Sequence, residues 1–350
     1  MRKILKYMDI VLLAILLAGA LVFRYAPGTG EFYARHLYPA ISAVLSALSC
    51  VLPFSLDEWA VVFMAVFLIA WPVMAKRRGR TWKRIVLREI EWILWIYVWF
   101  YWGWGMNYYR DSFYSRAGVR PAEYREDAFR AFLDNYADSL NSAFLQSLPD
   151  GYDAPEDSVR GEIKSLFRKV PEHYGLTTPK GYQTPKYTCF NFLYSSVGVL
   201  GYMGPFFAES HLNRELSRLE YPFTYAHELS HLLGIGSEAE ANFWAYTVCT
   251  ASSDPAIRYS GFFGIFPYVI SNARNLLGRE ECSSWLSTVD SRIVGQLGDR
   301  QRFWSARYSP FIGKIQESMY EMYLKGNRIS SGQKNYAEVV LLLLSVEDSM

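Results

Sequence analysis

The chain has 350 residues, of which 51% are hydrophobic, 17% aromatic and 20% charged, and its formal net charge is +2. This length accommodates a membrane anchor and one sizeable domain. Lys and Arg form no basic stripe beyond the first hundred residues, so the composition does not describe a protein that binds nucleic acid. The four cysteines show no Cys-x-x-Cys spacing and indicate neither a cysteine zinc site nor a disulfide framework, although one disulfide stays open among Cys189, Cys249 and Cys282.

Apolar stretches in the first 110 residues are long enough to be interpreted as membrane spans. We predict spans at about 7–24, 58–75 and 91–108, the third of which is rich in the Trp and Tyr residues typical of a membrane surface. A further uncharged stretch at 37–56 contains serines and two prolines, and we expect a re-entrant or interfacial helix there rather than a span. A cleaved signal peptide is the alternative interpretation of the first stretch.

The positions of basic residues predict which side of the membrane each segment faces. Lys and Arg cluster between residues 76 and 88, and further basic residues stand at positions 2, 3 and 6. Because basic loops stay in the cytoplasm, both segments are expected there, and three spans satisfy this requirement. We therefore predict a multi-pass protein of the cell (inner) membrane, with residues 1–106 as the anchor in the lipid bilayer and residues 107–350 as one extracytoplasmic domain.

The segment 107–350 has the charge density of a soluble domain and shows mainly helical patterns. Apolar spacing predicts amphipathic helices over Pro121–Leu148 and Asp157–Val170. Aromatic and β-branched residues with glycines between about Lys186 and Phe207 predict short strands and tight turns. Further helical patterns follow at Pro255–Leu277, Cys282–Leu297, Ser309–Leu324 and Tyr336–Val346. The expected fold is α+β and mostly helical.

A His-Glu-x-x-His motif lies in the segment Tyr-Ala-His-Glu-Leu-Ser-His-Leu-Leu-Gly that begins at Tyr225. His227 and His231 are one helical turn apart, so both imidazoles can reach one zinc ion (Zn2+) at about 2.0 to 2.1 Å. Glu228 can accept a proton from zinc-activated water during attack on a carbonyl group. The other residues from 222 to 235 are uncharged, whereas a solvated helix face would carry charged neighbours.

The third metal ligand is expected just after the motif. Gly234 can end the first helix, and Ser237 can cap a second helix that follows at once. Glu238 then completes a His2Glu site, while Asn242, one turn further on, can hydrogen-bond the far nitrogen of a ligand histidine. Glu240 is the alternative ligand, although it also stands three residues after Ser237, where a glutamate closes a capping box.

These motifs resemble those of the gluzincins, metallopeptidases that pair HExxH with a downstream ExxxD or ExxAD helix. The resemblance implies that His227 and His231 are ligands, Glu228 the general base and Glu238 the third ligand, with Asn242 in place of the Asp that supports a histidine. The spacing between His231 and Glu238 is shorter than in most gluzincins. Gly234 also fits the metzincin pattern HExxHxxGxxH, but a serine occupies its third His position.

Over nearly its full length, the chain resembles an uncharacterised family of bacterial multi-pass membrane proteins. In that family, N-terminal spans precede a zincin-like domain that carries HExxHxxG followed by ExEAN. The resemblance implies the same division of this chain into an anchor and a zincin-like catalytic domain.

Residues on either side of the motif supply two further expectations. The segment Gly201–His211 stands where metallopeptidases have an edge strand that binds substrate, although a core strand fits it equally well. His211 and Tyr246 are the nearest candidates for stabilising the oxyanion, and the alternative for His211 is an ordinary buried loop histidine.

The predicted function is zinc-dependent hydrolysis of peptide bonds in a peptide or protein substrate. The alternative is a non-catalytic membrane protein that holds zinc structurally and acts as a binding or regulatory module. The presence of Glu228 favours the enzyme, because a structural site has no use for a general base. The sequence indicates no oligomeric state.

Overall fold

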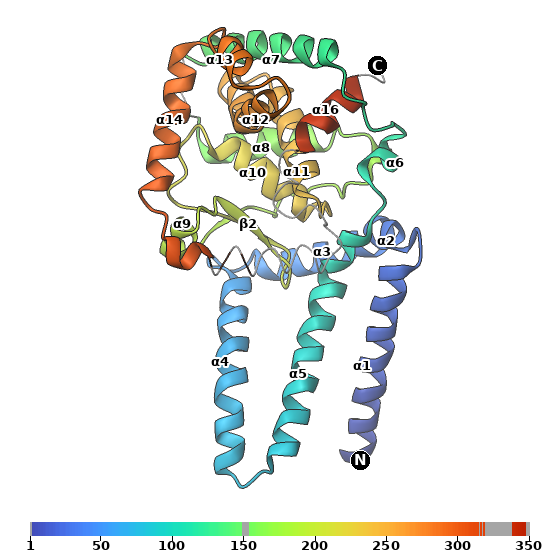
Figure 1. The fold of residues 1–350 in the computed structure, drawn as a ribbon. Helices are drawn as coiled ribbons and strands as arrows, with labels where there is room; N and C mark the ends of the chain where they lie inside the picture. The colour runs from blue at the N-terminus through green and yellow to red at the C-terminus, as the bar shows by residue number, and fades with distance from the viewer. Residues whose placement is uncertain (1, 149–153, 315, 317, 319–337, 348–350) are drawn as a thin grey trace.

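The computed structural model describes residues 2–148, 154–314, 316, 318 and 338–347. The long helices α1 (Arg2–Tyr25), α4 (Leu56–Arg77) and α5 (Trp82–Gly103) project from one side of a globular domain (Figure 1). The remaining described helices lie in that domain or join it to the long helices: α2 (Thr29–Phe32), η1 (Tyr33–Leu37), α3 (Tyr38–Ser49), η2 (Gly105–Tyr109), α6 (Phe113–Ala117), α7 (Glu126–Ser147), α8 (Glu156–Phe167), η3 (Glu172–Tyr174), α9 (Asn191–Ser196), α10 (Tyr221–Leu232), α11 (Glu238–Thr250), α12 (Pro255–Leu276), α13 (Arg279–Leu286), α14 (Ser291–Ser305) and α16 (Val339–Glu347).

A small sheet accompanies these helices. It contains β1 (Lys186–Tyr187), β2 (Gly201–Gly204) and β3 (Glu209–Leu212) in the order β1-β3-β2. β3 runs parallel to β1 and antiparallel to β2, with Tyr202 opposite His211. β2 is therefore an edge strand. The described residues confirm a mostly helical chain with few strands, and all four cysteines are free.

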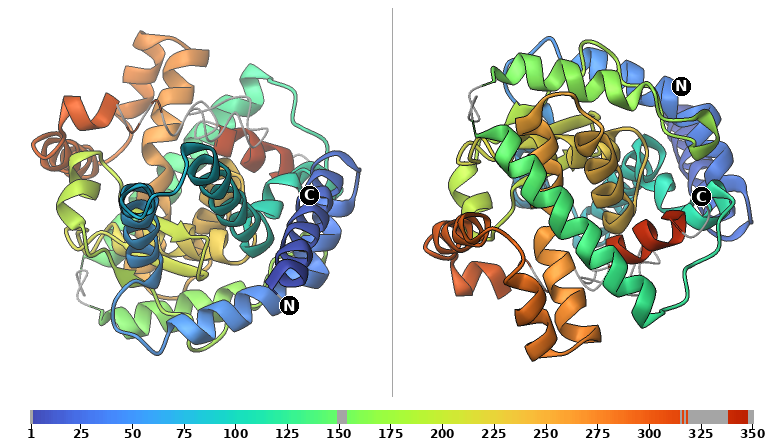
Figure 2. Two further views of the ribbon diagram at one scale, coloured as in Figure 1. Left: turned by 90° about the horizontal axis from the view of Figure 1, so that it is seen from below. Right: turned by 90° about the horizontal axis from the view of Figure 1, so that it is seen from above.

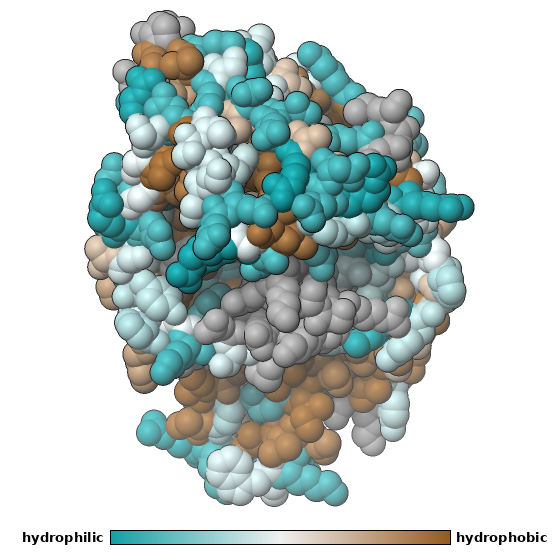
Figure 3. All heavy atoms as spheres, turned by 45° about the horizontal axis from the view of Figure 1, so that its top comes forward, coloured by the Kyte–Doolittle hydropathy of each residue, from teal (hydrophilic) through white to brown (hydrophobic). Residues whose placement is uncertain are grey.

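Two helices are long and apolar enough to cross a membrane, namely the segment Tyr7–Tyr25 of α1 and the whole of α4. Large apolar side chains on both are exposed, such as Ile15 (62%) and Phe63 (69%). Figure 3 shows hydrophobic surface gathered over the long helices, below a mainly hydrophilic face of the domain. Apolar surface of this extent is unfavourable in water, so these helices indicate membrane association.

The predicted third span, 91–108, coincides with the second half of α5 and with η2. α5 does not meet the same criteria of length and composition as the other two helices. Its first turns carry five charged residues at positions 83, 84, 88, 89 and 91, and its second half is rich in Trp and Tyr rather than aliphatic residues.

The stretch 37–56 forms α3, which has 12 residues and is too short to span a bilayer. α3 runs across the direction of the long helices, along the edge of the domain that faces them (Figures 1 and 2). Ser42 and Ser46 are buried, and the Ser46 hydroxyl donates a hydrogen bond to the carbonyl of Ala208 in the domain at 3.0 Å. The opposite side exposes Val44 and Leu48, so α3 is amphipathic.

The domain core lies where α10, α11 and α12 pack against one another, with α7 across α12. Its fully buried side chains include Tyr225 and Leu229 of α10, Ala241 of α11, and Phe263 and Phe266 of α12. Figure 2 shows α7 crossing this group of helices on the side away from the long helices. The site helix α10 is thus held in the centre of the domain.

Two parts of the predicted helix pattern differ from the structure. The helix expected over Cys282–Leu297 is divided into α13 and α14, because Asp290 caps a new helix by accepting a hydrogen bond from the backbone N–H of Arg292. The short helix α9 lies within the segment where strands were expected. The helices predicted at Ser309–Leu324 and Tyr336–Val346 fall partly outside the described residues, and α16 covers part of the second.

A buried ion cluster joins the N-terminal segment to the domain. The Glu31 carboxylate accepts hydrogen bonds from Arg35 at 2.7 Å and from two nitrogens of Arg110 at 2.9 Å. Arg110 also donates to the carbonyl of Gly234, two residues after the end of α10. Burial by itself raises the pKa of Glu31. The hydrogen bond and positive charge of Arg110, together with the charge of Arg116, outweigh the effect of burial, so the pKa of Glu31 lies below its usual value.

We predict that Glu31→Gln lowers the free energy of unfolding by about 3 kcal/mol at pH 7, because Arg110 then remains buried without its anion. The native stabilisation is fully present above the unfolded pKa of about 4.3 and is lost as pH falls through the lower folded pKa. Chemical unfolding in detergent micelles measures the free energy of unfolding of both proteins. The difference in this free energy between the native chain and the variant should become smaller as the pH falls toward 3. Glu126→Gln, at an exposed ion pair with Arg130, serves as the control, and an equal loss there would contradict this account.

Candidate metal centre

The site is built on the turn between α10 and α11. α10 has Pro222 in its first turn and ends at Leu232, after which Gly234 adopts a φ of 97°, a conformation that favours glycine. Ser237 then caps α11, since its hydroxyl accepts a hydrogen bond from the backbone N–H of Glu240 at 3.3 Å. The chain reverses within five residues, and Glu238, the first residue of α11, comes to lie opposite the histidines of α10.

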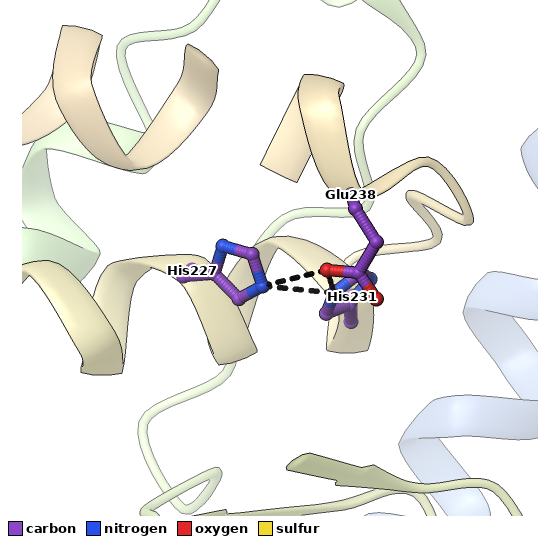
Figure 4. A group of neighbouring side chains, drawn as sticks. All are labelled: His227, His231 and Glu238. Atoms are coloured by element: carbon purple, nitrogen blue, oxygen red, sulfur yellow. Dashed lines mark hydrogen bonds and ion pairs between the residues drawn. The ribbon is translucent and has the colours of Figure 1, made fainter. Parts of the chain in front are cut away.

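The structure brings together His227, His231 and Glu238, whose ligand atoms lie within 4.8 Å of one another (Figure 4). The two Nε2 atoms are 3.2 Å apart, and Glu238 Oε2 is 3.2 Å from His227 Nε2 and 3.5 Å from His231 Nε2. A tetrahedral zinc ion about 2.1 Å from each ligand atom would separate those atoms by about 3.4 Å. The donor set and its spacing therefore fit zinc.

Backbone and amide oxygens fix the orientation of both imidazoles. His227 Nδ1 is 2.9 Å from Asn242 Oδ1, and His231 Nδ1 is 2.7 Å from the carbonyl oxygen of Ile235. Because a carbonyl oxygen can only accept, Nδ1 carries a proton in each ring, so Nε2 is the nitrogen whose lone pair is offered to a metal ion when the ring is neutral. This is the arrangement that metal-binding histidines require.

The centre concentrates negative charge. Burial raises the pKa of Glu238, but the charges and hydrogen bonds of His231 and His227 outweigh burial and lower it well below its usual value. Burial lowers the pKa of His231, whereas the charge of Glu238 and its hydrogen bond, with the charge of Glu228, raise it to about 9. A site that favours positive charge so strongly also suits a divalent cation.

Glu240, the alternative ligand, faces away from this centre. Its carboxylate accepts a hydrogen bond from Trp244 Nε1 at 3.0 Å and pairs with the guanidinium of Arg116. Arg116 donates in turn to the carbonyl of Tyr174 at 2.6 Å. Glu240 is therefore occupied by a buried ion pair.

Glu228 is buried beside the histidines, and its Oε2 has no hydrogen-bond partner in the described part of the chain. A Cβ atom at position 201 would lie 2.8 Å from the Cγ atom of Glu228. Only glycine therefore allows β2 to pass this close to the Glu228 side chain. Burial raises the pKa of Glu228, although the charges of His227 and His231 act in the opposite direction. An unpaired carboxylate with a raised pKa is suited to accept a proton.

A cavity of about 550 Å³ opens beside Glu228 and the three candidate ligands. One side is the edge strand β2, and another is formed by Trp104 and Tyr108, which follow α5. Tyr268 of α12 and Arg300 of α14 also line it, and no spacing in the sequence points to either residue. The lining also includes Tyr194, Val197, Gly198, Val199, Leu200, Phe223, Thr224, Asn242 and Gly264.

His211 and Tyr246, the predicted oxyanion stabilisers, are not among the described residues that line this cavity. His211 lies on β3, fully buried, with Nε2 2.7 Å from the hydroxyl of Ser55 and 3.3 Å from the carboxylate of Glu209. Tyr246 packs against the ring of Phe262. The structure does not bring either side chain to the ligands.

Side chains from the N-terminal segment bind the carbonyl groups at the end of the site helix. Trp104 Nε1 donates to the carbonyl of His231 at 2.9 Å, and the Tyr38 hydroxyl donates to that of Leu232 at 2.8 Å. The His231 carbonyl also accepts from the backbone N–H of Gly234 at 3.0 Å. The Leu232 carbonyl is one of the last in the helix and has no partner within it, so the Tyr38 hydroxyl satisfies a group that burial would otherwise leave unpaired. The site helix is thereby attached to α3 and to the segment that directly follows α5.

A comparison with protein families matches residues 33–344 to the family described as "Protein of unknown function (DUF3810)". Comparisons with curated proteins and with solved structures give no match. The matched segment includes α4, α5 and every residue of the candidate centre. Since the match extends over most of the chain, the protein belongs to this family, DUF3810.

Proposed function

We propose that this chain is a membrane-anchored zinc metallopeptidase. The observation that carries the proposal is the spacing of His227 Nε2, His231 Nε2 and Glu238 Oε2 beside a cavity that also receives Glu228. Structural zinc sites usually have four protein ligands, whereas the described residues provide three here. A cavity and an unpaired carboxylate at the remaining side favour a catalytic role.

The chain's own residues can carry the proton transfers of hydrolysis. Zinc held by the three ligands would act as a Lewis acid and make water more acidic, with a pKa of about 7. Glu228 accepts a proton from the water molecule while the water oxygen forms a bond to the peptide carbonyl carbon. Glu228 then gives this proton to the amide nitrogen as the C–N bond breaks, which yields a carboxylic acid and an amine. Asn242 and the Ile235 carbonyl hold both imidazoles in place.

The cavity walls supply groups for binding an extended peptide. β2 is an edge strand, so its free side can pair with the substrate backbone next to Glu228. Tyr268 and Arg300 line the same cavity, and both carry donors that can stabilise negative charge developing on the carbonyl oxygen. Arg300 Nε itself donates to Glu220 at 2.9 Å, which leaves its terminal nitrogens for this role.

The arrangement of the long helices supports an extracytoplasmic domain. The N-terminus and the turn between α4 and α5 lie at the same end, opposite the domain (Figure 1). The basic cluster between residues 76 and 88 covers the end of α4, this turn and the start of α5, and basic residues also stand at positions 2, 3 and 6. The positive-inside rule assigns this end to the cytoplasm. We propose that α1, α4 and α5 all cross the cell (inner) membrane and that the catalytic domain lies outside the cytoplasm.

We predict that Glu228→Gln lowers kcat/KM for peptide hydrolysis by about 100-fold to 10,000-fold, because the amide cannot accept the proton. The assay uses the full-length chain in detergent and a mixed library of internally quenched peptides, with zinc content measured in parallel. Zinc binding should be unchanged, since Glu228 is not a ligand. Full activity in the variant would exclude Glu228 as the general base. Bound zinc without hydrolysis by the native chain would instead favour a structural zinc site in a non-catalytic binding protein.

We predict that Asn242→Ala weakens zinc affinity by about 10-fold to 100-fold, because His227 Nδ1 loses its acceptor and the ring its fixed orientation. Competition with a chromophoric chelator measures this affinity without any substrate. Asn242→Asp keeps an acceptor oxygen at this position and should retain the affinity. Equal affinities for the native chain and Asn242→Ala would contradict the supporting role of Asn242.

A further inference from the structure

The hairpin between β2 and β3 is attached to the ends of two long helices. The backbone N–H groups of Phe206 and Phe207, at the tip of the hairpin, donate to the Asp57 carboxylate in the first turn of α4 at 2.9 and 3.0 Å. Trp99 of α5 donates through Nε1 to the carbonyl of Phe206 at 3.0 Å. The tip is therefore held between the domain ends of α4 and α5.

β2 connects this tip to the catalytic glutamate over a short distance. Its first residue, Gly201, lies against the side chain of Glu228, and its last residue, Gly204, lies against the carboxylate of Asp57. An antiparallel strand rises about 3.4 Å per residue, so three residues cover about 10 Å. A peptide paired with β2 would thus reach the first turn of α4 within about three residues of Glu228.

The surroundings of the cavity are also suited to a bilayer surface. Tyr194 of α9 stacks on Tyr202 of β2, while the same short helix exposes Phe192 (75%) and Leu193 (47%). Phe190, just before α9, contacts the ring of Trp59 in the second turn of α4. Exposed aromatic and aliphatic residues next to a membrane helix are typical of the interface between lipid and water.

A second group of exposed apolar residues continues this surface. Val44 and Leu48 of α3, with Val51 (77%) and Phe54 (42%) in the loop before α4, are exposed on the segment that crosses the direction of the long helices. Their continuity with α4 assigns them to the same lipid surface. The domain then rests on the bilayer, with the cavity close above it.

We propose that the substrates are polypeptides anchored in the same membrane and that they are cut close to its surface, about three to six residues from the end of the anchoring span. This inference rests on the proposed peptidase activity. A substrate strand along β2 points at one end to the domain ends of α4 and α5, beside which a membrane span can continue it. Confinement to one bilayer also raises the effective concentration of substrate, which favours anchored chains over soluble peptides.

The test uses full-length protein in liposomes of phosphatidylethanolamine and phosphatidylglycerol. The probe is a random peptide library joined to a single polyleucine transmembrane helix, and the comparison probe is the same library without the helix. Mass spectrometry gives the cut positions, and Glu228→Gln provides the blank. We expect cuts within about six residues of the span and a rate at least about 100-fold above that of the free library.

The outcomes separate the two levels of the proposal. Equal cleavage of both libraries, or cuts spread evenly along the anchored one, would overturn the inference about substrates and leave the peptidase activity intact. Cleavage of neither library by the native chain would overturn both.

Discussion

The arrangement of the candidate site depends on hydrogen bonds to the carbonyl groups at the end of α10 and in the turn that follows it. Trp104, Tyr38 and Arg110 donate to the carbonyls of His231, Leu232 and Gly234, and all three donors come from the N-terminal third of the chain. The His231 carbonyl also accepts from the backbone N–H of Gly234, but without Tyr38 and Arg110 the buried carbonyls of Leu232 and Gly234 would be left unpaired, at a cost of about 1 to 3 kcal/mol each. These bonds fix the turn that places Glu238 opposite the histidines. The segments that connect the long helices to the domain are therefore part of the framework of the candidate metal centre. A cut between residues 106 and 107 would remove two of the three donors.

The core of the candidate site could be predicted from the sequence because its determinants are local. A one-turn spacing places His227 and His231 on one helix face, and a glycine followed by a capping serine sets the start of the next helix. Glu238 and Asn242 lie where that reasoning expects them, and the capping position of Glu240 also follows from it. The rest depends on contacts between distant segments.

Those distant contacts explain what the sequence could not supply. Arg116 is 124 residues from Glu240, and nothing in either segment indicates that they pair. Tyr268 and Arg300 reach the cavity through the packing of α12 and α14, whereas His211, which is closer in sequence to the motif, faces Ser55 and Glu209. The break between α13 and α14 depends on one cap at Asp290, which periodicity alone does not reveal. The mostly helical fold was predictable, but the boundaries and the partners of buried polar groups were not.

Zinc content of the purified full-length chain tests the central claim most directly. Elemental analysis of the native protein, of Glu238→Gln and of Glu240→Gln compares the two glutamates in one experiment, with circular dichroism to establish that each variant is folded. A His2Glu centre predicts stoichiometric zinc in the native chain and in folded Glu240→Gln, and loss of zinc in Glu238→Gln. A native chain that binds no zinc, or a Glu238→Gln variant that binds it as tightly as the native chain, would contradict the account.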